Sequence, residues 1–210
     1  KNFGVVSNPE FLVMGKAIQD SLKPDRIVIG AWEEKDFAIM RQIYLMFYGS
    51  PSVKYIEVNP SEAAAGKLLA NYYLFSKLAN CFDVMGRTCE AFTGLKFENL
   101  RDILSSDSRI GSWGFFESLS AGGSCLVKDS RSLMHQLQSK NKNTALLNET
   151  YLANKRQLDN FMNRAETEAG FDWAQKKVAI LGLAFKRDTN DIRESAAVKI
   201  TGLILARNIK

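Results

Sequence analysis

The chain has 210 residues, 46% of them hydrophobic and 24% charged, so it can bury a core and form one or two domains. No apolar run approaches the roughly 20 residues that span a bilayer, and the basic residues behind the net charge of +5 are scattered, so we expect neither a membrane nor a nucleic-acid partner. The three cysteines lack a Cys-x-x-Cys spacing, which indicates no disulfide framework and no metal site and fits a cytoplasmic setting.

The first 60 residues alternate β-rich runs with one helical pattern. Strands are predicted at residues 3–7, 26–30 and 53–58, and the apolar spacing of residues 33–47 predicts a helix. This alternation is typical of an α/β sheet. Because the first run follows Lys1 directly and the last helical pattern continues to the final residue, we expect the chain to be an internal piece of a longer protein.

From Ser61 the sequence changes to an alanine-rich helical pattern. No Gly or Pro interrupts residues 67–85, so one long helix is predicted from Ser61 to about Arg87. A Gly- and Ser-rich loop at residues 105–124 divides the helices that follow. Those shorter helices are predicted at residues 97–104, 127–138 and 144–168.

The pattern returns to α/β near the end of the chain. Residues 177–183 give a basic start, a short apolar run and a glycine, which predict a strand, and residues 194–208 predict a helix. A second α/β domain begins in this way. The charged connection between them lies at the carboxyl end of the predicted strand, where ligands bind in open sheets, so Lys186 is a candidate phosphate ligand. A solvated loop explains the same residues equally well.

Cys125 is the leading candidate nucleophile. It follows Gly122 and Gly123 and opens a predicted helix, whose N-terminus favours a thiolate. Asp129 comes one helical turn later, where a carboxylate can order a water or exchange protons. The alternative is a buried structural cysteine beside a surface aspartate.

The long helix carries a second candidate pair. Lys67 and Asn71 are four residues apart and share a helix face, so together they can bind an oxyanion, although a lysine on a helix is more often simply solvated. Cys81 and Cys89 are assigned to packing.

These segments together resemble the UDP-glucose/GDP-mannose dehydrogenase family. The resemblance rests on six matches that occur in the family's order across nearly the whole chain: residues 7–12, residues 24–30, Lys67 with Asn71, residues 109–111, residues 122–129 and residues 181–195. One departure is that Ser120 and Ala121 stand where the family usually has Gly-Phe before Gly122 and Gly123.

The resemblance implies an α/β fragment in three parts. Residues 1–60 resemble the end of a Rossmann-like NAD-binding domain, residues 61–172 an all-helical dimerisation domain with one long helix, and residues 173–210 the start of a second Rossmann-like domain that binds the UDP-sugar. NAD is the implied cofactor. Because the chain contains no Gly-x-Gly-x-x-Gly run, we expect it to bind NAD weakly and to be inactive by itself.

The resemblance also implies a role for each candidate residue. Cys125 resembles the thiol that forms a thiohemiacetal and then a thioester. Lys67 and Asn71 resemble the groups that stabilise oxyanions, Asp129 the group that handles protons or water, and Glu10 the glutamate of thioester hydrolysis. The implied substrate-binding residues are Phe11, Leu12, Arg109 from across a dimer interface, Gly122 and Lys186, and the implied cofactor-binding residues are Lys186 and Arg193.

The implied reaction is the NAD-dependent, four-electron oxidation of UDP-glucose to UDP-glucuronate by a homodimer paired through the long helix. Residues 24–30 are closer to the UDP-glucose branch of the family than to the GDP-mannose branch. The alternatives are a GDP-mannose or UDP-N-acetylhexosamine dehydrogenase and, from a different class, a catalytically silent dimerisation module. An accessible, reactive Cys125 separates an enzyme from such a module.

Overall fold

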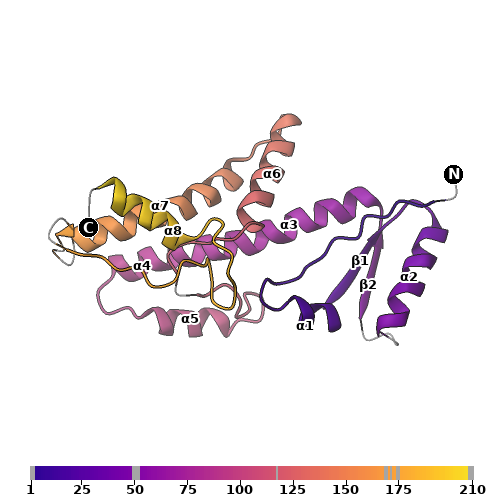
Figure 1. Ribbon diagram of the computed structural model, residues 1–210, viewed down its shortest axis with the longest axis horizontal. Helices are drawn as coiled ribbons and strands as arrows, with labels where there is room; N and C mark the ends of the chain where they lie inside the picture. The colour runs from indigo at the N-terminus through magenta and orange to yellow at the C-terminus, as the bar shows by residue number, and fades with distance from the viewer. Residues whose placement is uncertain are drawn as a thin grey trace. The chain divides into compact units, whose positions relative to one another are not determined.

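The protein is described by a computed structural model that covers residues 3–48, 53–116, 118–167, 170, 172–173 and 176–207 (Figure 1). The chain divides into two compact units, Lys1–Ala70 and Asn71–Lys210. Among the described residues, no helix combines the length and the hydropathy that crossing a membrane requires.

The first unit is built on two parallel strands. Strand β1 (Arg26–Gly30) pairs with β2 (Lys54–Val58) in a register that sets Val28 opposite Ile56, and α2 (Glu34–Tyr48) connects them. These three elements confirm the α/β prediction for this part of the chain. Ile27 and Ile29 are buried with Val53, and aromatic side chains of α2 pack against this core.

Two features of the first unit differ from the prediction. The strand predicted at residues 3–7 was wrong, because only Ser7 forms a bridge, antiparallel to Gly30, and Val5 remains 73% exposed. A short helix, α1 (Ala17–Leu22), was missed. Its six residues include no buried one, so the sequence carries no apolar periodicity there.

A long helix leads into the second unit. Helix α3 (Pro60–Ala79) continues through a π-helical turn (Asn80–Met85) into α4 (Gly86–Ala91), which confirms the prediction of uninterrupted helix from Ser61 to Arg87. Five buried residues of this helical stretch form a core with two residues on either side of Cys125, Ala121 and Val127. The five are Phe75, Leu78, Cys81, Phe82 and Met85. Cys81 is 2% exposed, so its assignment to packing is confirmed.

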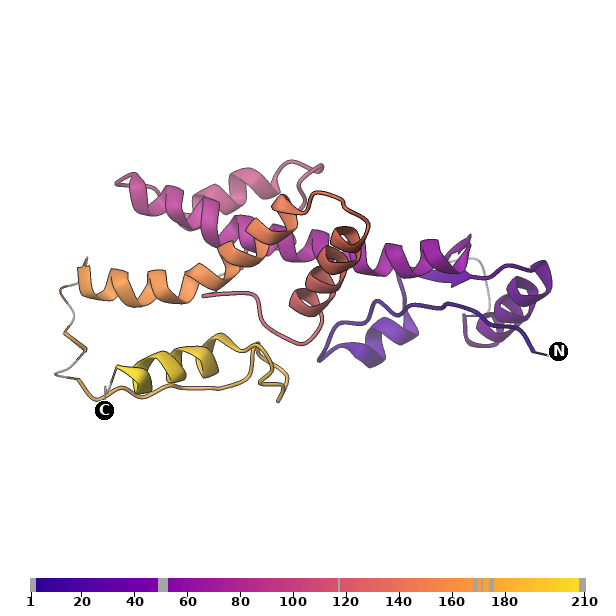
Figure 2. The same ribbon diagram turned by 90° about the horizontal axis from the view of Figure 1, so that it is seen from above.

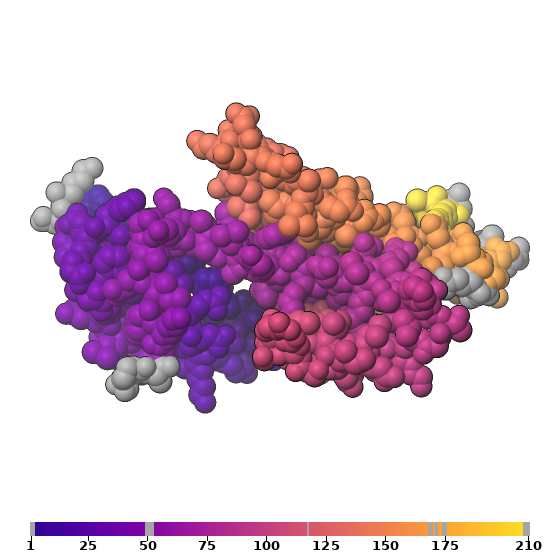
Figure 3. Space-filling model, turned by 180° about the vertical axis from the view of Figure 1, so that it is seen from behind, coloured from indigo at the N-terminus to yellow at the C-terminus, as the bar shows by residue number. Residues whose placement is uncertain are grey.

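The other predicted helices of the second unit are also present. They are α5 (Phe97–Ser105), α6 (Leu126–Ser139), α7 (Ala145–Thr167) and α8 (Ala196–Ala206). Helices α7 and α8 run side by side (Figure 2) and bury Leu158, Met162, Ile200 and Ile204 between them. The turn that joins α6 to α7 stands out from the unit's surface (Figure 3), and its residues 139–143 are exposed.

The strand predicted at residues 177–183 is not formed. The described residues from 176 to 183 are in no strand, and Leu181 is 94% exposed. A strand needs a neighbour to pair its backbone N–H and C=O groups, and no described segment pairs with this one. The apolar run is therefore extended but unpaired.

Candidate active site

Cys125 lies immediately before the first turn of α6. Its thiol is exposed, and its Sγ is 3.6 Å from the Ser124 hydroxyl oxygen. The Asp129 backbone N–H donates to the Cys125 carbonyl oxygen at 2.9 Å, which closes the first turn of the helix. The predicted position of Cys125 at a helix N-terminus is confirmed.

Asp129 is buried and hydrogen-bonded, which excludes the alternative that it is a surface aspartate. The Asn71 amide on α3 donates to Asp129 Oδ2 at 2.6 Å, across 58 residues of sequence, and the Lys128 ammonium lies 2.7 Å from Asp129 Oδ1. Both Asn71 and Asp129 are less than a tenth exposed. The Asp129 carboxylate raises the pKa of Lys128. The sequence grouped Asn71 with Lys67 and gave no sign that Asn71 binds Asp129.

The two glycines before Cys125 are required by close packing against the segment 185–194. A side chain at Gly122 would come within 2.7 Å of the Glu194 carbonyl oxygen, and one at Gly123 within 3.0 Å of the Phe185 ring. Gly123 also has φ +85, a backbone conformation that favours glycine. Its N–H donates to the Arg193 carbonyl oxygen at 2.9 Å. The loop is thus fixed at a short distance from this segment.

Ala121 takes the position at which the resembled family usually has an aromatic residue. It is 4% exposed and belongs to the core cluster with Phe75 and Val127. Its side chain is therefore enclosed by the protein's own apolar residues.

Arg193 and Lys186 lie in the segment that packs on this loop. Arg193 donates to both carboxylate oxygens of Asp191, with distances of 2.8 Å to Oδ2 and 3.0 Å to Oδ1. The hydrogen bonds to Asp191 and its negative charge raise the pKa of Arg193, and Cys125 makes a smaller electrostatic contribution in the same direction. Lys186 is partly exposed, and its ammonium is 5.7 Å from the centre of the Phe185 ring.

In the first unit, the structure brings Glu10 to Lys67. The Lys67 ammonium donates to the Glu10 carbonyl oxygen at 2.5 Å and lies 3.3 Å from its Oε1. The Glu10 carboxylate also accepts from the Leu12 N–H at 2.7 Å, which fixes the turn. The Phe11 ring lies under two cations, Arg26 at 3.9 Å and Lys67 at 5.1 Å. Sequence reasoning named Glu10, Phe11, Leu12 and Lys67 but did not foresee the contact between Glu10 and Lys67.

Arg109 lies on the exposed loop after α5. Its guanidinium pairs with Asp107, two residues earlier, at 2.6 Å, and its side chain is 87% exposed. Asp107 raises the pKa of Arg109, and the arginine lowers the pKa of Asp107. Arg109 is available at the surface of the unit.

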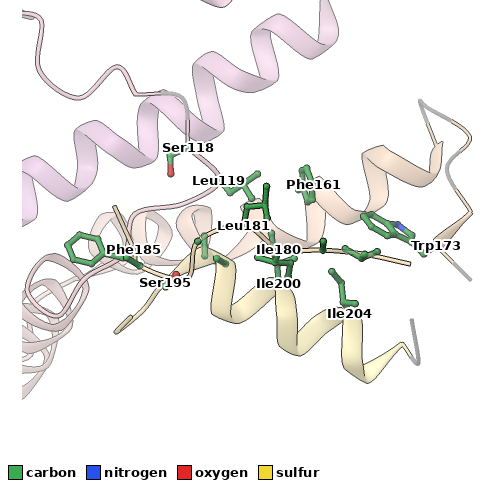
Figure 4. Close-up of a pocket in the computed structure, with 16 residues that line it drawn as sticks. Ser118, Leu119, Phe161, Trp173, Ile180, Leu181, Phe185, Ser195, Ile200 and Ile204 are labelled. Atoms are coloured by element: carbon green, nitrogen blue, oxygen red, sulfur yellow. The ribbon is translucent and has the colours of Figure 1, made fainter. Parts of the chain in front are cut away.

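A cavity of about 390 Å³ lies in the second unit, where Phe185 and Ser195 form part of its wall (Figure 4). Leu119, Phe161 and Trp173 line it together with Ile200 and Ile204 of α8, so its wall is mostly apolar. Neither Cys125 nor Asp129 contributes to this wall. The cavity is therefore not where the candidate nucleophile acts. In the part of the chain that the structure describes, no cluster of His, Cys, Asp and Glu is placed to hold a metal ion.

Comparison with known proteins gives consistent matches along the chain. Residues 1–48 match the model of the NAD binding domain of the UDP-glucose/GDP-mannose dehydrogenase family, and residues 61–156 match the model of its central domain. The chain is 33% identical over 211 residues to UDP-glucose 6-dehydrogenase of Rickettsia conorii, covering 99% of this chain and 47% of that protein. It is 32% identical to UDP-glucose 6-dehydrogenase 1 of Glycine max, covering 94% of this chain and 42% of that protein.

A solved structure of a UDP-glucose dehydrogenase also matches nearly the whole chain. A UDP-glucose dehydrogenase from the hyperthermophilic archaeon Pyrobaculum islandicum superposes with a TM-score of 0.89 at 31% identity. The match covers 99% of this chain and 46% of that one. The chain spans about half the length of the curated relatives it matches.

Proposed function

The chain belongs to the UDP-glucose/GDP-mannose dehydrogenase family, and we propose that its protein oxidises the C6 alcohol of UDP-glucose to the carboxylate of UDP-glucuronate. The observation that carries this proposal is the exposed Cys125 thiol at the start of α6, four residues before the buried Asp129 that Asn71 binds at 2.6 Å. Curated relatives named UDP-glucose 6-dehydrogenase support the choice of substrate.

Cys125 explains how an alcohol is taken to an acid without releasing the aldehyde. Loss of a hydride and a proton from the C6 alcohol leaves an aldehyde, and the thiolate sulfur adds to its carbon to give a thiohemiacetal. Loss of a second hydride from that carbon, together with the hydroxyl proton, leaves a thioester, and the acceptor of both hydrides would be NAD, the cofactor of the family. Water then attacks the carbonyl carbon, the carboxylate is released, and the thiol is restored. Cys125 is exposed, so a sugar can reach it.

Asp129 and Asn71 are proposed to interact with the oxygen atoms that react in these steps, those of the attacking water and of the oxyanion. A carboxylate bound by an amide and an ammonium, as Asp129 is by Asn71 and Lys128, is held in one orientation. We propose that it accepts a proton from the attacking water. Asn71 and Lys67 are one helical turn apart on α3, and each is proposed to stabilise oxyanionic oxygen.

NAD is the family's cofactor, because residues 1–48 match the NAD binding domain of the family. The residues present do not supply a diphosphate-binding turn, because the sequence has no Gly-x-Gly-x-x-Gly run and the described sheet has two strands. We therefore assign no step to residues around the dinucleotide. The cofactor contacts of Lys186 and Arg193 stay predictions from the family resemblance.

The remaining assignments are also proposals. The domain limits are 1–60, 61–172 and 173–210, and the two family models fall within the first two ranges. Glu10 is proposed for thioester hydrolysis, and Phe11, Leu12, Gly122 and Lys186 for substrate binding. The Arg109 side chain is exposed to solvent, and we propose that it reaches a nucleotide sugar bound by a second copy of the chain. A homodimer paired through the long helix and a cytoplasmic location stay predictions.

The test is an assay of the complete protein with NAD and a panel of nucleotide sugars. We expect two NADH for each UDP-glucose consumed and UDP-glucuronate as product, with GDP-mannose and UDP-N-acetylhexosamines turned over far more slowly. Faster oxidation of one of the other sugars would mean that the protein is a family member with that sugar, and not UDP-glucose, as its substrate. Oxidation of no sugar in the panel, with an unreactive Cys125, would favour the silent dimerisation module.

A further inference from the structure

We propose that Asn154 is a positioning residue for Cys125, which acts by fixing the backbone of the loop that ends at the thiol. Asn154 lies on α7, and its side chain binds the backbone of Ala121 at both polar groups. The Ala121 N–H donates to Asn154 Oδ1 at 2.7 Å, and the Asn154 amide donates to the Ala121 carbonyl oxygen at 3.1 Å. One side chain therefore replaces the partners that a neighbouring strand would give this residue.

The two hydrogen bonds between Asn154 and Ala121 are buried, so their loss would be costly. Asn154 is 5% exposed and Ala121 is 4% exposed, so water cannot take over either hydrogen bond if the amide is lost. A buried backbone group left without a partner costs more than the bond itself contributes. The loop at Ala121 would then move to find new partners, and the displacement would reach Cys125, four residues on.

The loop has a second anchor beyond Ala121. Gly123 N–H donates to the Arg193 carbonyl oxygen at 2.9 Å, with the Phe185 ring packed against the glycine. Between the two anchors and Cys125 there are only small residues, which give the backbone little stiffness of their own. Asn154 on α7 and the segment at Arg193 thus hold the loop from two sides, and the direction of the thiol at the start of α6 depends on both.

Asn154 acts through the loop and not on the substrate. Its hydrogen bonds are to Ala121, and it is buried, whereas Cys125 is exposed. Because access to the thiol is already open, loosening the loop offers no gain in reactivity. Loosening the loop removes the fixed position of the Cys125 sulfur at the N-terminus of α6, so its reactivity should fall.

The experiment compares Asn154→Asp and Asn154→Ala in the complete protein. Asn154→Asp keeps the shape and the acceptor for the Ala121 N–H but loses the donor to the carbonyl, and Asn154→Ala loses both without adding charge. If Asn154→Ala does not fold, Asn154→Ser serves as the uncharged variant. The matched control is Asn163→Asp, the same change on the same helix at an exposed position.

The main measurement is the rate of Cys125 alkylation by iodoacetamide, followed on its own peptide by mass spectrometry well below the melting temperature. We expect it to fall by about tenfold, the factor that corresponds to the loss of one net hydrogen bond, while Cys89 alkylation and the control variant stay unchanged. An unchanged rate at Cys125 in folded Asn154 variants overturns the proposal. An equal change at all cysteines also overturns it, because that marks a general loss of stability.

Turnover gives a second measurement that rests on the proposed function. We expect kcat with UDP-glucose to fall by a similar factor, while KM changes little, because Asn154 does not contact the sugar. If the wild-type protein oxidises no nucleotide sugar, the proposed function fails, but the alkylation rates still decide the role of Asn154. If alkylation slows but kcat is unchanged, Asn154 positions Cys125 only in the enzyme without substrate. That outcome would overturn the role of Asn154 in the reaction.

Discussion

The Lys67 ammonium on α3 donates to the backbone carbonyl oxygen of Glu10 at 2.5 Å and lies 3.3 Å from the Glu10 carboxylate. This contact joins residues 57 positions apart within the first unit. It places next to each other two groups that the sequence assigned separately, one to oxyanion stabilisation and one to thioester hydrolysis. A lysine that holds the turn of its neighbouring glutamate affects both proposed roles at once.

Lys67→Gln is expected to lower kcat/KM for UDP-glucose in the complete protein by about 10² to 10³, as loss of an oxyanion-stabilising group does. Stability should change by less than about 1 kcal/mol, because the Glu10 carboxylate of the ion pair is 58% exposed. Steady-state kinetics and thermal unfolding measure the two effects. Lys35→Gln, which removes an exposed lysine paired with Glu33 at 2.6 Å, is the control and should leave turnover unchanged. Equal losses in both variants would exclude a specific role for Lys67.

Cys125→Ser is expected to stop the four-electron reaction. A serine hydroxyl is a far weaker nucleophile at neutral pH, and the ester it forms is a poorer acyl donor than a thioester. The first hydride loss should continue slowly, so residual product should be aldehyde or trapped ester. The measurement is NADH released per sugar consumed, with Cys89→Ser as the control. Two NADH per sugar and free uronate in the Cys125→Ser variant would remove the thiol from the mechanism.

Gly123→Ala is expected to destabilise the second unit by about 1 to 3 kcal/mol. The added Cβ would lie 3.0 Å from the Phe185 ring, at a residue whose φ of +85 an L side chain rarely adopts. Because the strain falls two residues before Cys125, thiol alkylation should also slow. Urea unfolding measures the stability, and Gly202→Ala on α8, where the added methyl meets nothing within 4 Å, is the control. That control should be neutral or stabilising.

Glu57→Gln tests a pH dependence in the first unit. Hydrogen bonds from Arg41, at 2.5 and 2.7 Å, lower the pKa of Glu57 below its ordinary value of 4.5, against a smaller opposing effect of burial. Because the folded pKa is depressed, the stabilisation is present above the unfolded pKa and is lost as pH falls through the folded pKa. Urea unfolding should therefore show the variant less stable at pH 7, with the difference shrinking below pH 4.5. A constant difference across this range would contradict the assignment.

The proposed homodimer is expected to have twice the 23.5 kDa mass of the chain in light scattering at micromolar concentration. Tyr73 on the long helix is 69% exposed, and Tyr73→Lys should convert the dimer to a monomer by burying a charge in the interface. Leu146→Lys, at a position on α7 that is 73% exposed, is the control and should leave the mass unchanged. If the wild-type chain is a monomer, the proposal of a homodimer paired through the long helix is overturned.

The sequence by itself determined the elements whose apolar residues repeat with a clear period. The pattern of residues 61–87 predicted the long helix, and the short apolar runs predicted β1 and β2, because these signals come from local periodicity. Sequence motifs also predicted Cys125 at a helix start. The strand prediction was wrong at residues 177–183, where the apolar run has no neighbouring strand to pair with among the described residues.

Only the tertiary structure decided which distant residues meet. Asn71 binds Asp129, Lys67 binds Glu10, and Asn154 holds Ala121. Each contact is a hydrogen bond between segments that are brought together by packing of the cores, so no local spacing encodes it. Burial was decided in the same way: the sequence left Asp129 open as a surface residue, and enclosure beside Asn71 makes it a fixed, hydrogen-bonded carboxylate.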